Sequence, residues 1–199
     1  MSMTPSQPSP PRISPTKASQ PELRHCVLLG LMGTGKTAIG ERLASVLSLR
    51  FQDNDSRLVA SSGLTPRELR LRDGVAVLHA LEAEELLAAL RDPSPSVICG
   101  AASVVENGDC RRALQDAGVC AIWLRARAST LAARFYNEPH RPVYSRDLTA
   151  FFERQLVSRG PLYLDVSDAI IDIDELSLAE AVAHARDAVR AYVVSVRAG

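Results

Sequence analysis

The chain has 199 residues, a formal net charge of zero, 46% hydrophobic residues and 23% charged residues. This length and composition are typical of one globular domain with a sizeable core. Zero net charge gives no electrostatic reason to expect nucleic acid or a membrane surface as a partner, and no apolar run approaches the ~18 residues that span a bilayer. We therefore expect neither a nucleic-acid nor a membrane partner.

Residues 1–22 differ in composition from the rest of the chain. They contain six prolines, five serines and few large apolar side chains. They also lack the apolar stretch of a secretory signal peptide. We predict a disordered tail over 1–22 and a single domain over 23–199.

The first strand candidate, residues 25–29, leads directly into Gly30-Leu31-Met32-Gly33-Thr34-Gly35-Lys36-Thr37. This is a complete G-x-x-x-x-G-K-[ST] phosphate-binding loop, and a helical pattern follows it. The glycines let backbone N–H groups point at the phosphates, Lys36 reaches the β- and γ-phosphates, and Thr37 offers its hydroxyl to Mg²⁺. A helix N-terminus favours anions. The segment therefore predicts a nucleotide site.

Short apolar runs alternate with helical patterns along the rest of the chain. This alternation, with a phosphate loop after the first strand, predicts an α/β fold with a five-stranded parallel sheet and helices on both faces. Strands are predicted at 25–29, 49–53, 96–99, 120–124 and 168–172, and helices at 36–48, 56–61, 66–72, 75–91, 109–117, 128–135, 147–159 and 177–196.

Ligands of parallel sheets bind beyond the carboxyl ends of the strands. Asp53-Asn54-Asp55 follow the second strand, and Gly100-Ala101-Ala102 follow the third. A stretch with Arg134, Pro139, Arg141 and Pro142 follows the fourth strand, and we predict that it forms a mobile lid. Arg159-Gly160-Pro161-Leu162-Tyr163 should follow the next helix.

Several classes of phosphate-loop protein do not fit. A GTPase needs N-K-x-D to read guanine, but the only lysines are Lys17 and Lys36. A transporter-type ATPase needs an apolar strand ending in Asp-Glu, whereas the third strand ends in Cys99-Gly100. The short length, the D-x-D after the second strand and the arginine-bearing lid indicate a small-metabolite kinase.

From about Arg24 to Asp174 the chain resembles the shikimate kinases. The resemblance rests on an ordered set of motifs rather than on one of them. These are the phosphate loop, Phe51-Gln52-Asp53-Asn54-Asp55, Arg72-Asp73-Gly74 leading to Leu81-Glu82, Arg141-Pro142, and Arg159-Gly160-Pro161-Leu162-Tyr163. It implies a P-loop kinase fold and ATP- and Mg²⁺-dependent transfer of a phosphoryl group to the 3-hydroxyl of shikimate, a small-molecule substrate, in a cytoplasmic monomer.

For the nucleotide, the resemblance implies that Lys36 and Thr37 hold the phosphates and Mg²⁺, and that Asp53 reaches the metal through water. Arg141 would close over the phosphates as a catalytic lid residue, and Arg134 would pack near adenine. The remaining cofactor-binding residues would be Gly33, Thr34, Gly35 and Ala38.

For the acceptor, the resemblance implies that Asp55 grips the acceptor hydroxyls and takes the departing proton, and that Arg159 pairs with the substrate carboxylate. Gly100 and Ala101 would line the substrate. The family pattern has an arginine where this chain has His79, and Gly-Gly-Gly where it has Gly100-Ala101-Ala102. Two added Cβ atoms should narrow the pocket, with strain if those residues need positive φ. A protonated His79 would bind an acceptor carboxylate, so KM should rise with pH.

Purely structural roles stay open for several of these residues, and so do other functions for the protein. Asp53 or Asp55 could simply cap a helix. Arg159 could complement a helix C-terminus, Arg141 could be a solvated loop residue, and His79 could be structural. Another small polyol or sugar acid could be the acceptor, and a non-catalytic sensor or partner module could keep the same fold.

Cysteines occur at 26, 99, 110 and 120, without a C-x-x-C pair. Cys26, Cys99 and Cys120 lie in apolar strand-like runs, where a thiol behaves as a small hydrophobic group. We predict reduced core cysteines in a cytoplasmic protein rather than a metal site or a disulfide framework.

Overall fold

The computed structural model describes residues 23–136 and 147–198. Five parallel strands form one sheet, as predicted, and their order in the sheet is β2-β3-β1-β4-β5. The strands are β1 (His25–Leu29), β2 (Arg50–Asp53), β3 (Ser96–Cys99), β4 (Val119–Arg125) and β5 (Ala169–Asp172). The predicted lid segment with Arg141 lies mostly within 137–146 and is outside the described residues.

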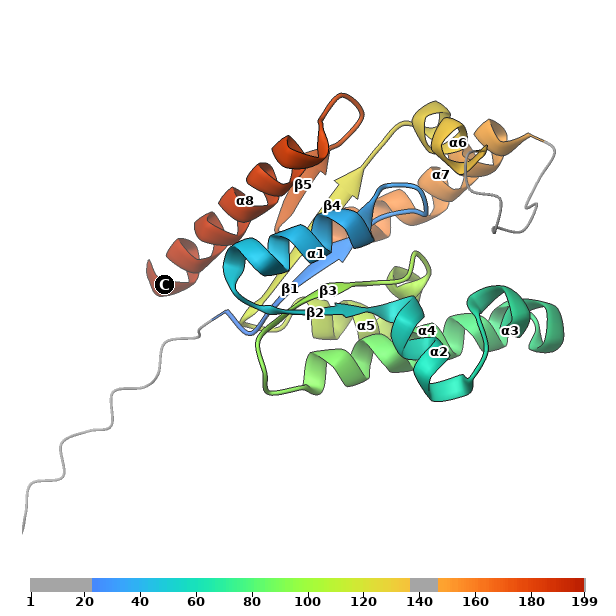
Figure 1. Ribbon diagram of the computed structural model, residues 1–199, viewed down its shortest axis with the longest axis horizontal. Coiled ribbons are helices and arrows are strands. Elements are labelled where there is room, and N and C mark those ends of the chain that lie inside the picture. The colour runs from blue at the N-terminus through green and yellow to red at the C-terminus, as the bar shows by residue number, and fades with distance from the viewer. Residues whose placement is uncertain (1–22, 137–146, 199) are drawn as a thin grey trace, which may run out of the picture.

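Helices cover both faces of this sheet (Figure 1). Helices α1 and α8 pack on one face and α4, α5 and α7 on the other, while α2 and α3 pack against α4, and α6 packs against α7. Their bounds are α1 (Lys36–Leu47), α2 (Asn54–Ser62), α3 (Pro66–Asp73), α4 (Val75–Arg91), the 3₁₀ turn η1 (Val104–Glu106), α5 (Gly108–Leu114), α6 (Ala128–Tyr136), α7 (Leu148–Val166) and α8 (Leu178–Ala198).

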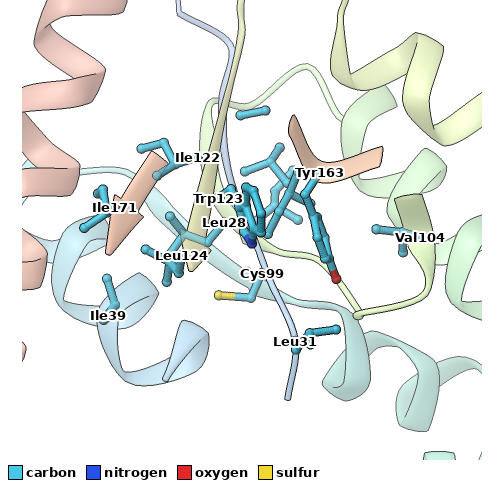
Figure 2. Close-up of a cluster of buried hydrophobic side chains, with 14 of the residues drawn as sticks. Leu28, Leu31, Ile39, Cys99, Val104, Ile122, Trp123, Leu124, Tyr163 and Ile171 are labelled. Carbon is cyan, nitrogen blue, oxygen red and sulfur yellow. The ribbon is translucent and has the colours of Figure 1, made fainter. Parts of the chain in front are cut away.

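The three central strands are the most deeply buried part of the sheet. Every residue of β1 and β3 is buried, whereas the edge strands β2 and β5 each have one buried residue. Strands covered by helices on both faces favour continuous apolar runs, which is why the sequence pattern located them well. Figure 2 shows Leu28, Ile122 and Leu124 of this core between the sheet and its helices.

All four cysteines are buried, as predicted, and their thiols are free in this structure. None of the described helices combines the length and the apolar character that crossing a bilayer requires.

The predicted end of the helix at residue 159 is wrong. Helix α7 continues through Pro161 to Val166. A proline inside a helix cannot donate a backbone hydrogen bond and costs stability. Here the following turn carries Tyr163, which is fully buried, stacks on Trp123 with 5.4 Å between ring centroids, and donates from its hydroxyl to the Ala102 carbonyl at 2.8 Å. This packing keeps the helix going past the proline.

The order of the strands determines where a ligand can bind. The chain runs from β1 to β2 and β3 on one side and then to β4 and β5 on the other. The connections therefore diverge at the carboxyl end of β1, which is where ligands bind in open α/β sheets. The phosphate loop leaves β1 at this end.

Candidate functional site

The phosphate loop has the backbone shape that its glycines permit. Gly33 and Gly35 have φ values of +85° and +80°, a region that side-chain-bearing residues rarely adopt. Gly35 is the N-cap of α1, and no described side chain caps the N–H groups of that first turn. The N-terminus of α1 can therefore present backbone N–H groups and a positive helix dipole to an anion.

The side chains of the loop hold its shape. The Lys36 Nζ donates to the carbonyl oxygens of Gly30 at 2.8 Å and Leu31 at 3.0 Å. The buried Thr34 hydroxyl donates to the Leu31 carbonyl at 2.9 Å. The loop is thus curled, and the Lys36 ammonium lies across it. This arrangement can bind a chain of phosphate groups.

A hydroxyl and a carboxylate meet beside this loop. The Thr37 Oγ1 donates to Asp53 Oδ2 at 3.1 Å, and the other Asp53 oxygen accepts from the Ser56 N–H at 3.0 Å. Asp53 is therefore the N-cap of α2, while Asp55 lies in the first turn of that helix. The capping alternative is right for Asp53 and wrong for Asp55. Capping uses only one Asp53 oxygen, so the other still faces Thr37.

One cavity of about 870 Å³ brings the candidate residues together. It extends from the phosphate loop to the loop after β3 and the middle of α7. Every described residue that the sequence predicts for the site lines it: Gly33, Thr34, Gly35, Lys36, Thr37, Ala38, Asp53, Asp55, His79, Gly100, Ala101, Arg134 and Arg159. The role of Arg141 stays a prediction, because it lies outside the described residues.

Arg134 connects the phosphate loop to the segment that follows β5. From α6, its guanidinium donates to the Gly33 carbonyl at 3.5 Å and to the Ile173 carbonyl at 3.3 Å. Ile173 and residues 176–178, between β5 and α8, line the same end of the cavity. Sequence reasoning missed this segment, although its position after the last strand was a signal.

Arg159 lies in the middle of α7, so the alternative that it complements a helix C-terminus is wrong. Its side chain is only 8% exposed, and its Nε donates to Glu106 Oε1 at 2.9 Å. The other Glu106 oxygen lies 3.3 Å from His79 Nδ1. Glu106, from η1, therefore joins α4 to α7.

His79 does line the cavity, but its charge differs from that of the arginine of the family pattern. Burial lowers the pKa of His79, the guanidinium groups of Arg159 and Arg70 lower it further, and the Glu106 carboxylate acts in the opposite direction. The ring is therefore mostly neutral at neutral pH. His79 therefore becomes a cation at neutral pH only if a further negative charge nearby favours its protonated form.

Ala101 and Ala102 fit without the backbone strain that we considered. Ser48 is the only non-glycine residue with positive φ among those that the structure describes, so neither alanine adopts that conformation. The added methyl groups do stand in the cavity wall. Their effect is therefore on the shape of the acceptor site rather than on backbone energy.

A buried carboxyl group forms the floor of the acceptor end. Glu82 of α4 is 8% exposed and accepts a hydrogen bond from the Ser103 hydroxyl. Burial raises its pKa to about 7, the Ser103 bond opposes this rise, and the Asp55 carboxylate adds to it. Glu82 is part of a sequence motif that does not indicate its role. No motif includes Glu106, although its place in the loop after β3 was a signal.

These features define a P-loop kinase that acts on a small molecule: a phosphate cradle at the central strand, a hydroxyl–carboxylate pair beside it, and carboxylates and a guanidinium at the other end of one cavity. A family model described as "Shikimate kinase" matches residues 32–190. The chain belongs to the shikimate kinase family, whose members are ATP-dependent phosphotransferases.

Individual relatives agree with this assignment. The chain is 38% identical over 141 residues to a shikimate kinase of Mesorhizobium japonicum, covering 70% of this chain and 68% of that protein. It is 31% identical over 154 residues to a shikimate kinase of Paramagnetospirillum magneticum, and the match covers 77% of this chain and 78% of that protein. The Acinetobacter baumannii shikimate kinase, solved with shikimate, superimposes with a TM-score of 0.77 at 22% identity over 88% of this chain and 96% of that one, which is a likeness of fold.

Proposed function

We propose that this protein transfers the γ-phosphoryl group of ATP to the 3-hydroxyl of shikimate. The observation that carries the proposal is the cavity of about 870 Å³, which is lined at one end by the phosphate loop and at the other by Asp55 and Arg159. Phosphoryl transfer needs the nucleotide and the acceptor in line, and one continuous cavity can hold both.

The chain's own groups would bind and orient the nucleotide. The uncapped N–H groups at the start of α1 and the Lys36 ammonium would take the phosphates. Arg134, next to the Gly33 carbonyl and the β5–α8 segment, would pack near the base. Lys36 would exchange its bonds to loop carbonyls for bonds to phosphate oxygens.

Thr37 and Asp53 fit a magnesium ion. A hydroxyl and a carboxylate oxygen 3.1 Å apart at the edge of a phosphate cradle are hard oxygen donors of the kind that Mg²⁺ prefers. Mg²⁺ commonly takes only one or two such protein oxygens and completes its shell with phosphate and water. When bound, the ion would neutralise charge on the phosphate oxygens.

At the acceptor end, Asp55 would hold the reacting hydroxyl and receive its proton, while Arg159 would hold the carboxylate. Arg141 would close over the phosphates. We propose that the enzyme works as a monomer. The four free, buried cysteines support a reducing compartment, and we propose the cytoplasm.

One observation favours a second candidate, a kinase of another small polyol or sugar acid. The acceptor end carries His79 and Glu106 around Arg159 instead of a second arginine. This arrangement offers a carboxylate less positive charge than two arginines would.

The test is ADP release with shikimate, quinate and gluconate, each compared with a reaction that lacks an acceptor. We expect shikimate to give the highest kcat/KM and Lys36→Ala to abolish release. Arg42→Ala, which removes an exposed cation from the same helix, should keep its activity. Turnover unchanged in Lys36→Ala would refute the kinase assignment. A higher kcat/KM with another acid would favour the second candidate, and no acceptor-dependent release at all would favour a non-catalytic protein.

A further inference from the structure

Glu106 is the central group of a three-residue cluster at the acceptor end. Its two carboxylate oxygens contact different elements. Oε1 accepts from the Arg159 Nε of α7 at 2.9 Å, and Oε2 lies 3.3 Å from the His79 Nδ1 of α4. Glu106 itself belongs to η1, which directly follows the alanines of the cavity wall. A single carboxylate therefore ties two walls of the acceptor end together.

This contact leaves the terminal nitrogens of Arg159 available. Within residues 23–136 and 147–198, the Nε–Glu106 bond is the only hydrogen bond that the Arg159 side chain makes. A guanidinium has five donors, and its Nη1–Nη2 edge can hold a second carboxylate. Arg159 lines the cavity. An acceptor carboxylate can thus bind Arg159 without displacing Glu106.

Binding of a carboxylate changes the charge of this cluster. Glu106 cancels the charge of Arg159, so the incoming carboxylate leaves the group of Glu106, Arg159 and His79 with an excess negative charge unless the ring gains a proton. The charged groups that act on His79 are Glu106 from η1, Arg159 from α7 and Arg70 from α3. An additional anion beside a neutral imidazole favours its protonation. The His79 side chain is one-third exposed, so solvent can supply the proton.

We propose that Glu106 and His79 form a proton-linked counter-charge for the acceptor carboxylate. The carboxylate binds the Nη edge of Arg159, a proton from solvent goes to the His79 ring, and the Nδ1–H of the imidazolium donates to Glu106. An arginine at position 79 would already be charged and would need no proton. This inference rests on the proposed function in one respect, that the acceptor carries a carboxylate.

The test is calorimetry of shikimate binding to the full chain between pH 6.5 and 8.5, in buffers that differ in ionisation enthalpy. We expect binding to take up a substantial fraction of one proton at pH 8. The Kd should rise with pH, by up to about tenfold per pH unit where the ring is neutral in the free enzyme and charged in the complex.

Two variants test whether His79 is the group that takes up the proton when shikimate binds. His79→Gln removes the titrating ring, and we expect it to abolish proton uptake and to flatten the dependence of Kd on pH. Glu106→Gln keeps an oxygen that can accept from Arg159 but loses the charge. It should tighten shikimate about tenfold at pH 8, because Arg159 is no longer neutralised, and should reduce proton uptake. Asp116→Asn removes an exposed carboxylate near the end of α5 and should behave as the wild type.

Glu82 is the competing source of such a linkage, because its pKa of about 7 lies in the same range. Proton uptake that persists in His79→Gln would overturn the proposal. So would shikimate turnover with a Kd that is independent of pH. If shikimate and the other acids neither bind nor react while a neutral polyol does, both the proposed function and this inference fail. If shikimate is phosphorylated without proton uptake, only the inference fails.

Discussion

Glu82 makes the stability of the folded protein depend on pH in an unusual direction. Its pKa is raised from 4.5 to about 7 by burial. The folded chain therefore keeps a proton that the unfolded chain has already released between these two values. Unfolding releases that proton, so the free energy of unfolding falls as pH rises through this window.

The size of the effect follows from the shift in pKa. A shift from 4.5 to about 7 corresponds to about 3 kcal/mol, of which about 2.5 kcal/mol falls between pH 5 and pH 8. Because Glu82 is only 8% exposed, solvent screening reduces this little. Glu82→Gln cannot titrate, and its amide oxygen can still accept from Ser103. Its stability relative to the wild type should therefore improve by about 2.5 kcal/mol on going from pH 5 to pH 8.

The assay is urea unfolding of both proteins at pH 5, 6, 7 and 8 without ligands. Comparing the variant with the wild type at each pH cancels the titration of all other groups that the substitution leaves unchanged. Glu84→Gln, an exposed carboxylate of the same helix, controls for the removal of one charge. A difference between Glu82→Gln and wild type that stays constant from pH 5 to pH 8 would refute the reasoning.

Two further predictions concern α1 and the metal site. Gly40→Ala should destabilise the fold by about 1–3 kcal/mol in urea unfolding, because the new Cβ would lie 2.6 Å from Cys99 Sγ and 2.8 Å from a Phe51 ring carbon; an unchanged midpoint would contradict this packing. Asp53→Asn keeps a good helix cap but loses the charge beside Thr37, so the Mg²⁺ concentration for half-maximal rate should rise at least about tenfold at fixed ATP. A Mg²⁺ dependence like that of the wild type would remove Asp53 from the metal site.

The parts of the molecule that the sequence predicts well are those encoded by neighbouring residues. The phosphate loop is a motif of eight residues, and its last six, from Met32 to Thr37, line one cavity. Continuous apolar runs marked the strands, because both faces of the sheet are covered. The start of α2 was predicted two residues late, since Asp53 rather than a later residue caps it.

The parts that were missed depend on contacts between distant segments. Helix α7 passes Pro161 because Tyr163 stacks on Trp123, and no local pattern contains that contact. Arg159 and Glu106 are 53 residues apart in the chain, so their pairing follows only from the packing of α7 against η1. The sequence motifs therefore indicate where the acceptor end lies, but not the combined charge of Arg159, Glu106 and His79 there.

The bonds of Lys36 to the carbonyls of Gly30 and Leu31 also have a thermodynamic consequence for nucleotide binding. With the loop already curled, a nucleotide meets a preorganised receptor, and little backbone entropy is lost in forming it. The ammonium must, however, give up its carbonyl partners when it turns to phosphate oxygens. The observed binding enthalpy is then the difference between two sets of charge-assisted hydrogen bonds, smaller than a count of phosphate contacts alone would suggest.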